Sequence, residues 1–326
     1  MKQDTLEKTG MEYNQYMEQM KKLLTSCRLC PRNCGVNRLA GQKGYCGADA
    51  AVRIARAALH MWEEPCISGR EGSGAVFFSG CSLGCRYCQN QKISAGENGR
   101  EVSVERLAEI MLSLQEQKAN NINLVTAGHF APQTAAALSL AKKQGLMIPV
   151  IYNSSGYEKP ETLKLLAGLV NVYLPDFKYI TPELAKKYSR AGDYVETAKA
   201  ALEEMVRQTG NPRFDPRGMI TGGVIVRHLL LPGHVSEAKK VTEYLYRTYG
   251  DQIYISLMNQ YTPMPAMRED PLLSRRVTRR EYERLVDYAV SLGVSQGFIQ
   301  EGETAKESFI PEFDGEGVEE SRGRFG

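Results

Sequence analysis

The stretch that decides the fold spans residues 74–88 and reads Gly74-Ala75-Val76-Phe77-Phe78-Ser79-Gly80-Cys81-Ser82-Leu83-Gly84-Cys85-Arg86-Tyr87-Cys88. Its first part is a short apolar run that ends at a glycine, which predicts a buried β-strand. Its second part carries three cysteines in a C-x3-C-x2-C spacing, so a cysteine loop is expected directly after the strand. Thiolates this close together can converge only on a small, soft centre, either zinc or an iron–sulfur cluster.

The number of cysteines in this loop distinguishes the two kinds of centre. A structural zinc ion normally takes four protein ligands, and a 4Fe–4S cluster also has four corners. Three ligands would leave one iron of a cluster open, where a substrate or cofactor could chelate. The other interpretations are a zinc site or three unrelated buried thiols. The predicted position, at the carboxyl end of a strand, is where barrel enzymes place their chemistry.

Strand-like apolar runs recur along the chain with helical patterns between them. The predicted strands are 75–79, 123–126, 148–152, 172–177, 223–229 and 253–257, with a seventh candidate at 297–301. Ser103 is a possible N-cap before one helical pattern, and Thr278 with Glu281 reads as a capping box before another. This alternation predicts an α/β fold with a parallel sheet, arranged as a partial (β/α)6 TIM-like barrel that is open on one side.

Three regions follow from this pattern. Residues 1–70 are expected to form an N-terminal helix and a Cys-rich metal-binding extension, 71–301 the partial barrel, and 302–326 an acidic, Gly-rich tail. The chain has 326 residues, of which 42% are hydrophobic and 24% charged, as in a globular protein. The net charge of +3 is too weak to argue for nucleic acid.

The compartment is inferred from the apolar patterning and the cysteines. No apolar run reaches the roughly 18 residues of a membrane span, and acidic residues interrupt the N-terminal segment where a signal peptide would be apolar. We therefore expect a soluble, cytoplasmic protein that does not engage a membrane. In that compartment, cysteines are metal ligands or catalytic groups more often than disulfides.

A second group of cysteines, Cys27, Cys30, Cys34 and Cys46, lies in the predicted extension. It supplies four thiolates, which is a closed shell for one metal centre. Zinc and an auxiliary 4Fe–4S cluster both accept this ligand set. The spacing does not decide between them, and a small structural zinc-like knuckle is the slightly favoured interpretation. Four reduced thiols without a metal are the remaining alternative.

The motifs together resemble a known family. The aromatic residue before the last cysteine, in Cys85-Arg86-Tyr87-Cys88, is similar to the cluster loop of the radical S-adenosylmethionine (radical SAM) superfamily. Three further motifs resemble its uncharacterised iron–sulfur branch that is similar to pyruvate formate-lyase activating enzyme. They are the segments 27–34, 44–47 and 62–69. The resemblance covers about residues 23 to 265.

This resemblance implies a chemistry. Cys81, Cys85 and Cys88 would hold a 4Fe–4S cluster whose fourth iron binds the methionine end of S-adenosylmethionine. A reductant such as flavodoxin or ferredoxin would supply one electron, and cleavage would give a 5′-deoxyadenosyl radical that abstracts a hydrogen atom. The substrate could be a glycine of a partner protein, as for an activase. Alternatives are modification of another peptide or small molecule, and a non-catalytic zinc or iron–sulfur scaffold.

The cysteine loop and the predicted strand ends carry the candidate cofactor-binding residues. These are Tyr87, Thr126, Asn153, Ser155, Asp176, Lys178, Arg227 and His228. The resemblance implies a Gly-Gly-Glu motif after the second strand for the amine of S-adenosylmethionine, but this chain reads Thr126-Ala127-Gly128-His129. We therefore expect the Thr126 oxygen and backbone carbonyls to replace that contact.

Each of these side chains also has a structural interpretation. Asp176 and Lys178 could form an ion pair inside the barrel, and the candidate histidines could be core residues. Tyr87 could simply pack, and 153–156 could be a plain turn. Cys66 follows a polar segment that could close one edge of the active site, where Cys66 could donate a hydrogen atom or act as an extra ligand. The favoured interpretation of Cys66 is a buried structural cysteine.

Overall fold

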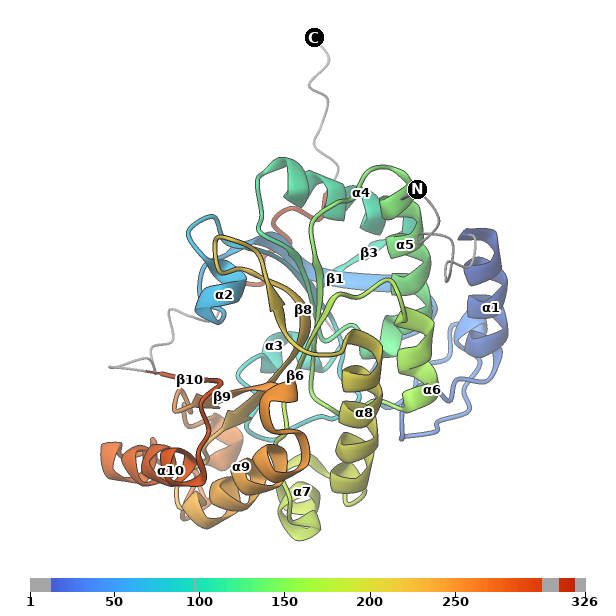
Figure 1. Cartoon of the computed structure of the whole chain (residues 1–326). Helices are drawn as coiled ribbons and strands as arrows, with labels where there is room; N and C mark the ends of the chain where they lie inside the picture. The colour runs from blue at the N-terminus through green and yellow to red at the C-terminus, as the bar shows by residue number, and fades with distance from the viewer. Residues whose placement is uncertain (1–12, 97, 301–310, 320–326) are drawn as a thin grey trace.

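The computed structural model describes residues 13–96, 98–300 and 311–319, and Figure 1 shows a curved sheet with helices packed around it. The strands of these residues are β1 (Val52–His60), β2 (Ser73–Phe78), β3 (Arg100–Val102), β4 (Ile122–Val125), β5 (Val150–Ser154), β6 (Val172–Pro175), β7 (Arg213–Phe214), β8 (Ile220–Leu229), β9 (Tyr254–Met258) and β10 (Gly297–Ile299). Their order in the sheet is β10-β9-β8-β6-β5-β4-β2-β1-β3, and β7 pairs with β8 beside this path.

Helices connect most of these strands. They are α1 (Tyr13–Thr25), α2 (Pro65–Ser68), α3 (Gln91–Ser94), α4 (Val104–Glu116), α5 (Ala131–Lys143), α6 (Pro160–Leu163), α7 (Pro182–Ser189), α8 (Tyr194–Thr209), α9 (Val235–Tyr249) and α10 (Arg279–Leu292). In Figure 1, α4, α5, α6 and α8 line one side of the curved sheet, and α7, α9 and α10 lie beyond β6, β8 and β9. The main apolar core lies between these helices and the strands.

The central strands are parallel, as the alternating pattern predicts. β2, β4, β5, β6, β8, β9 and β10 are parallel neighbours in that order. Within the described residues, the sheet runs as an open path from β10 to β3, so it does not close. The prediction of a partial barrel open on one side is therefore confirmed, and β10 adds the seventh parallel strand.

Local sequence signals fix several helix starts. The Ser103 side chain accepts a hydrogen bond from the Arg106 N–H at the start of α4, and Thr278 forms a capping box with Glu281 at the start of α10. Each satisfies backbone donors that have no partner within the helix. Both predicted caps are confirmed.

Two strands that the sequence pattern did not predict extend the sheet beyond β2. β1 pairs with β2 and with β3, in each case antiparallel. The boundary predicted at residue 70 thus falls between two hydrogen-bonded strands, and the three-region division stays a prediction. The alternation of strand and helix patterns predicts only parallel strands. It therefore gave no sign of β1 and β3, which pair antiparallel at one side of the sheet.

The N-terminal extension packs beside the barrel. α1 lies against α5, and Leu24, Cys27 and Leu29 form a small apolar cluster of their own. Residues 26–51 contain a single 3-10 turn, Arg38–Ala40. Among the helices of the described residues, none has the length and apolar character that a membrane span needs.

Candidate active site and metal centres

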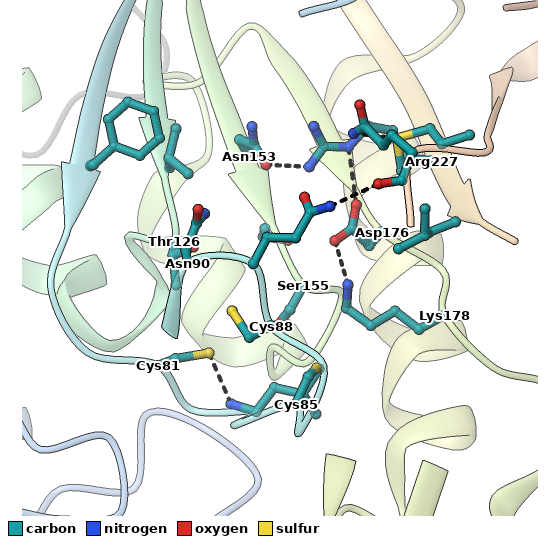
Figure 2. A pocket seen from close by; sticks show the side chains of 18 of the residues that line it. Cys81, Cys85, Cys88, Asn90, Thr126, Asn153, Ser155, Asp176, Lys178 and Arg227 are labelled. Carbon is teal, nitrogen blue, oxygen red and sulfur yellow. Dashed lines mark hydrogen bonds and ion pairs between the residues drawn. The ribbon is translucent and has the colours of Figure 1, made fainter. Parts of the chain in front are cut away.

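The three-cysteine loop follows the carboxyl end of β2 and lines a cavity of about 240 Å³ (Figure 2). β2 is buried along its whole length, which fixes the start of the loop. Cys81, Cys85 and Cys88 all line this cavity. The structure therefore brings the three thiols together on one wall of a single space.

The opposite wall comes from the carboxyl ends of the parallel strands. Side chains at the ends of β4, β5, β6, β8 and β9 line the cavity. They are Val125, Thr126, Asn153, Ser154, Ser155, Asp176, Lys178, Arg227, Leu229, Met258 and Gln260. Because parallel strands end at one edge of the sheet, residues far apart in the sequence meet here. Gln89 and Asn90 also line the cavity, and neither was a predicted site residue.

A network of charges crosses this wall. The Arg227 Nε donates to Asp176 at 3.0 Å, and the Lys178 ammonium lies 2.6 Å from the other carboxylate oxygen of Asp176. The Arg227 Nη2 donates to Asn153 Oδ1 at 2.6 Å. The ion pair predicted as a structural interpretation is present, and both of its members also line the cavity.

Burial and pairing act against each other on these charges. Burial alone would raise the pKa of Asp176, but the nearby Lys178 and Arg227 charges outweigh it and lower that pKa. Burial likewise opposes the charged form of Lys178, but Asp176 and Cys85 raise its pKa overall. All three groups are therefore charged at neutral pH.

The end of β1 and the segment between β1 and α2 close the cavity from another side. His60, Trp62 and Glu63 line it, and Glu63 binds Arg227 Nη1 at 3.1 Å. Glu63 belongs to the polar segment that could close one edge of the active site, but its contact with Arg227 was not predicted, because that contact depends on how the barrel curves. Cys66 lies instead in an apolar cluster with β5, β6 and β8 residues and does not line the cavity.

Thr126 has a strained backbone. Its φ of +63° lies in the left-handed region, which is unfavourable for a β-branched residue. Its N–H donates to the Asn153 carbonyl at 2.8 Å, and its side chain lines the cavity. Strain of this kind is typical of functional positions, and here it occurs where the resemblance implies a Gly-Gly-Glu motif.

Tyr87 lines the cavity but is also tied into the wall behind it. Its hydroxyl accepts a hydrogen bond from Tyr179 at 2.8 Å. Tyr179 also contacts Ser189 Oγ at 2.8 Å, and Ser189 donates to Cys85 Sγ at 3.1 Å. Tyr87 thus packs among other aromatic rings and is connected through Tyr179 and Ser189 to the Cys85 sulfur.

His129 and His228 are buried in the core, which corrects the placement of His228 among cofactor-binding side chains. On β8, successive side chains point to opposite faces, so Arg227 faces the cavity and His228 does not. His228 Nδ1 lies 2.7 Å from the Phe177 carbonyl. His129 is also buried, and burial lowers its pKa to about 3; the neutral ring donates Nε2–H to the Ser79 carbonyl at 2.8 Å.

The four N-terminal cysteines share a second, smaller cavity. Cys27, Cys30, Cys34 and Cys46 all line it, with Arg38 beside them. Burial raises the pKa of Cys30 to about 12, so a bound cation would be needed to hold that thiolate. In the described part of the chain, no group of three or more His, Cys, Asp or Glu side chains is arranged so that it could hold a metal ion.

Comparison with known proteins places the chain in a family. The sequence profile described as "Radical SAM superfamily" matches residues 75–238, and the chain belongs to that superfamily. It is 27% identical over 281 residues to "Uncharacterized protein MJ0674" of Methanocaldococcus jannaschii, an alignment that covers 84% of this chain and 77% of that one. The family implies a 4Fe–4S cluster and S-adenosylmethionine.

Among solved structures, the chain is similar to SuiB of Streptococcus suis. The structure of SuiB bound to precursor peptide SuiA matches with a TM-score of 0.46 and 12% identity, covering 69% of this chain and 47% of that one. SuiB bound to S-adenosylmethionine matches with a TM-score of 0.45 and 12% identity, covering 69% and 46%. The chain thus spans about half the length of these structures.

Proposed function

We propose that this chain cleaves S-adenosylmethionine reductively in the cavity behind the three-cysteine loop and removes a hydrogen atom from a glycine of a partner polypeptide. The shared cavity is the observation that carries the cleavage step, and the glycine substrate rests on the resemblance to pyruvate formate-lyase activating enzyme. Three thiols from one loop face a charged array from β5, β6 and β8 across it.

The donor set fits the cofactors of the family. Cys81, Cys85 and Cys88 would hold the cluster, and the three side chains come from eight consecutive residues. When bound, the 4Fe–4S cluster supplies one electron and an iron without a protein ligand, which is the centre that S-adenosylmethionine requires. A fourth cysteine does not line this cavity, so the set leaves that iron open.

The chain's own residues would bind and orient S-adenosylmethionine and would exclude water from it. Arg227 and Lys178 hold positive charge at the wall, and Asp176 holds negative charge between them. Such a fixed array can bind the carboxylate, the amine and the sugar hydroxyls of a charged nucleotide without reorganising. Asn153 and Ser155 add uncharged polar groups beside it. These residues would set the orientation on which hydrogen abstraction depends.

We also propose that the four N-terminal cysteines hold an auxiliary iron–sulfur cluster. The four side chains share one cavity, which supports a common centre. Four cysteine thiolates are a usual ligand set of a 4Fe–4S cluster, and a structural zinc ion accepts the same set, so the metal content of the purified chain decides between them. About eight iron atoms per chain would support this proposal, whereas about four with one zinc would overturn it.

The partners follow from the same chemistry. We propose flavodoxin or ferredoxin as the electron donor, and the cytoplasm as the compartment. All eight cysteines are free of disulfide bonds, which agrees with a reducing environment.

The test is release of 5′-deoxyadenosine by the anaerobically reconstituted, dithionite-reduced chain. The wild type and a Cys66→Ala control should release it, and Cys85→Ala should not. Release by Cys85→Ala would overturn the assignment. Incubation with peptides that contain glycine, followed by mass spectrometry, would distinguish a polypeptide substrate from a small molecule. A wild type without release would favour a scaffold.

A further inference from the structure

One arginine of the Cys-rich extension is bonded to the three-cysteine loop of the barrel. Arg32 lies between Cys30 and Cys34. Its Nε donates to the Ser82 carbonyl at 3.0 Å and its Nη2 to the Leu83 carbonyl at 2.9 Å. Both acceptors lie between the first two cysteines of the loop, so a segment of the first cysteine group contacts the second directly.

The same guanidinium also binds the end of α7. Its nitrogens donate to the carbonyls of Ser189 and Arg190, at 3.2 and 2.7 Å. The last carbonyls of a helix have no partner within it, and a cation there is favourable. Ser189 in turn donates its hydroxyl to Cys85 Sγ at 3.1 Å. Arg32 therefore joins four main-chain carbonyls, two of them in the loop.

Backbone contacts complete this attachment. Gly80 has a φ of +96°, and a Cβ there would lie 2.5 Å from the Cys46 carbonyl oxygen. Gly84 has a φ of +69°, and a Cβ there would lie 2.8 Å from the Tyr45 hydroxyl. The Tyr45 ring also stacks on Arg32, whose guanidinium carbon is 3.9 Å from the ring centroid. Glycine thus allows the loop to approach the extension closely.

A second arginine connects the extension to the start of the loop. Arg38 is almost fully buried and donates to Cys27 Sγ at 3.9 Å and to the His129 carbonyl. His129 then donates its ring N–H to Ser79, two residues before Cys81. The extension therefore contacts the first half of the loop directly through Arg32, and the strand end before the loop indirectly through His129.

We propose that the Cys-rich extension is an assembly platform for the three-cysteine loop, and that Arg32 is its positioning residue. The centre on the four N-terminal cysteines orders residues 30–34, and Arg32 passes this order to the loop. Loss of the first centre then loosens the second. This inference rests on the proposed function, because it concerns the site that holds the catalytic cluster.

The experiment compares Arg32→Lys and Arg32→Gln with an Arg28→Gln control in the full-length, reconstituted chain. Arg28 lies in the same segment, and its side chain is exposed. The readouts are amide hydrogen exchange of residues 81–88 and the rate at which a chelator bleaches the visible absorbance. Both Arg32 variants should exchange and bleach about tenfold faster, because bonds from a charged donor are lost. The control should match the wild type.

The Arg32→Lys variant shows whether Arg32 acts through the geometry of its hydrogen bonds or only through its positive charge. It keeps the charge but lacks the planar fork that reaches several carbonyls, so it should not rescue the loop. Wild-type rates in Arg32→Lys, or in Arg32→Gln, would overturn the inference. Cys30→Ser should loosen residues 81–88 to the same extent, and an unchanged loop in that variant would also contradict the platform.

Two further outcomes keep this inference separate from the proposed function. If the wild type releases 5′-deoxyadenosine and the Arg32 variants keep wild-type exchange, only the platform fails. If the wild type releases none, the proposed function fails, and loop exchange still decides on the platform. Should the Arg32 variants fail to fold by circular dichroism, Tyr45→Leu removes the exposed stacking ring. It should accelerate exchange about threefold, and unchanged exchange would overturn the inference.

Discussion

Asp176 is the residue whose loss should affect the cavity wall most strongly. Its carboxylate separates Arg227 and Lys178, and the side chains of all three are at most 18% exposed. Asp176→Asn keeps the shape and removes the charge. Arg227 retains Glu63, but the ion pairs of the described residues give Lys178 no other partner. Breaking a buried pair in this way costs about 3 kcal/mol of unfolding free energy.

The assay is guanidinium unfolding of the apo chain under reducing conditions, followed by circular dichroism. A control, Glu196→Gln, removes an exposed ion pair with Lys199 and should change the unfolding free energy by less than about 0.5 kcal/mol. Lys178→Met should cost less in the Asp176→Asn background than alone, because the unpaired cation is then gone. An Asp176→Asn variant as stable as the control would refute the buried-pair reasoning.

The other predictions concern separate parts of the fold. Thr126→Gly relieves a left-handed backbone and should stabilise the apo chain by about 1 kcal/mol, as should Lys118→Gly at a φ of +69°. Only Thr126→Gly should weaken S-adenosylmethionine binding in calorimetry, and equal binding by both would contradict a role for Thr126. Burial raises the pKa of Glu158 from 4.5 to about 7. Between these two pH values the folded chain keeps a proton on Glu158 that the unfolded chain loses. The free energy of unfolding should therefore fall as the pH rises from 4.5 to 7. Glu158→Gln should flatten that part of the profile in unfolding measurements at pH 5 and 8; an unchanged slope would show that Glu158 is not the group. Thr278→Ala removes the cap of α10 and should cost about 1 kcal/mol in the same unfolding assay, with no loss expected if the capping box is dispensable.

The parallel strands were predictable because each is a short apolar run before a turn or a helix start. β1 and β3 were not, because edge strands that pair antiparallel leave no mark on the βα alternation. The boundary at residue 70 reflects the same gap, since 75–79 was the first strand predicted and β1 lies before it.

The candidate site was predictable where strand ends identify it. Asp176, Lys178 and Arg227 were found because parallel strands end at one edge. His228 was misplaced because the two-residue period of a strand was not applied to it. Glu63 and Arg32 make their contacts with residues more than 45 positions away. Such contacts depend on the curvature of the sheet, which no local pattern encodes.

The most direct measurement is the electron paramagnetic resonance spectrum of the reduced, reconstituted chain, recorded with and without S-adenosylmethionine. A cluster with one iron that lacks a protein ligand should give a spectrum that changes when S-adenosylmethionine is added, and Cys88→Ala should remove this response. A reduced spectrum that is the same with and without S-adenosylmethionine would contradict an open iron in this cavity.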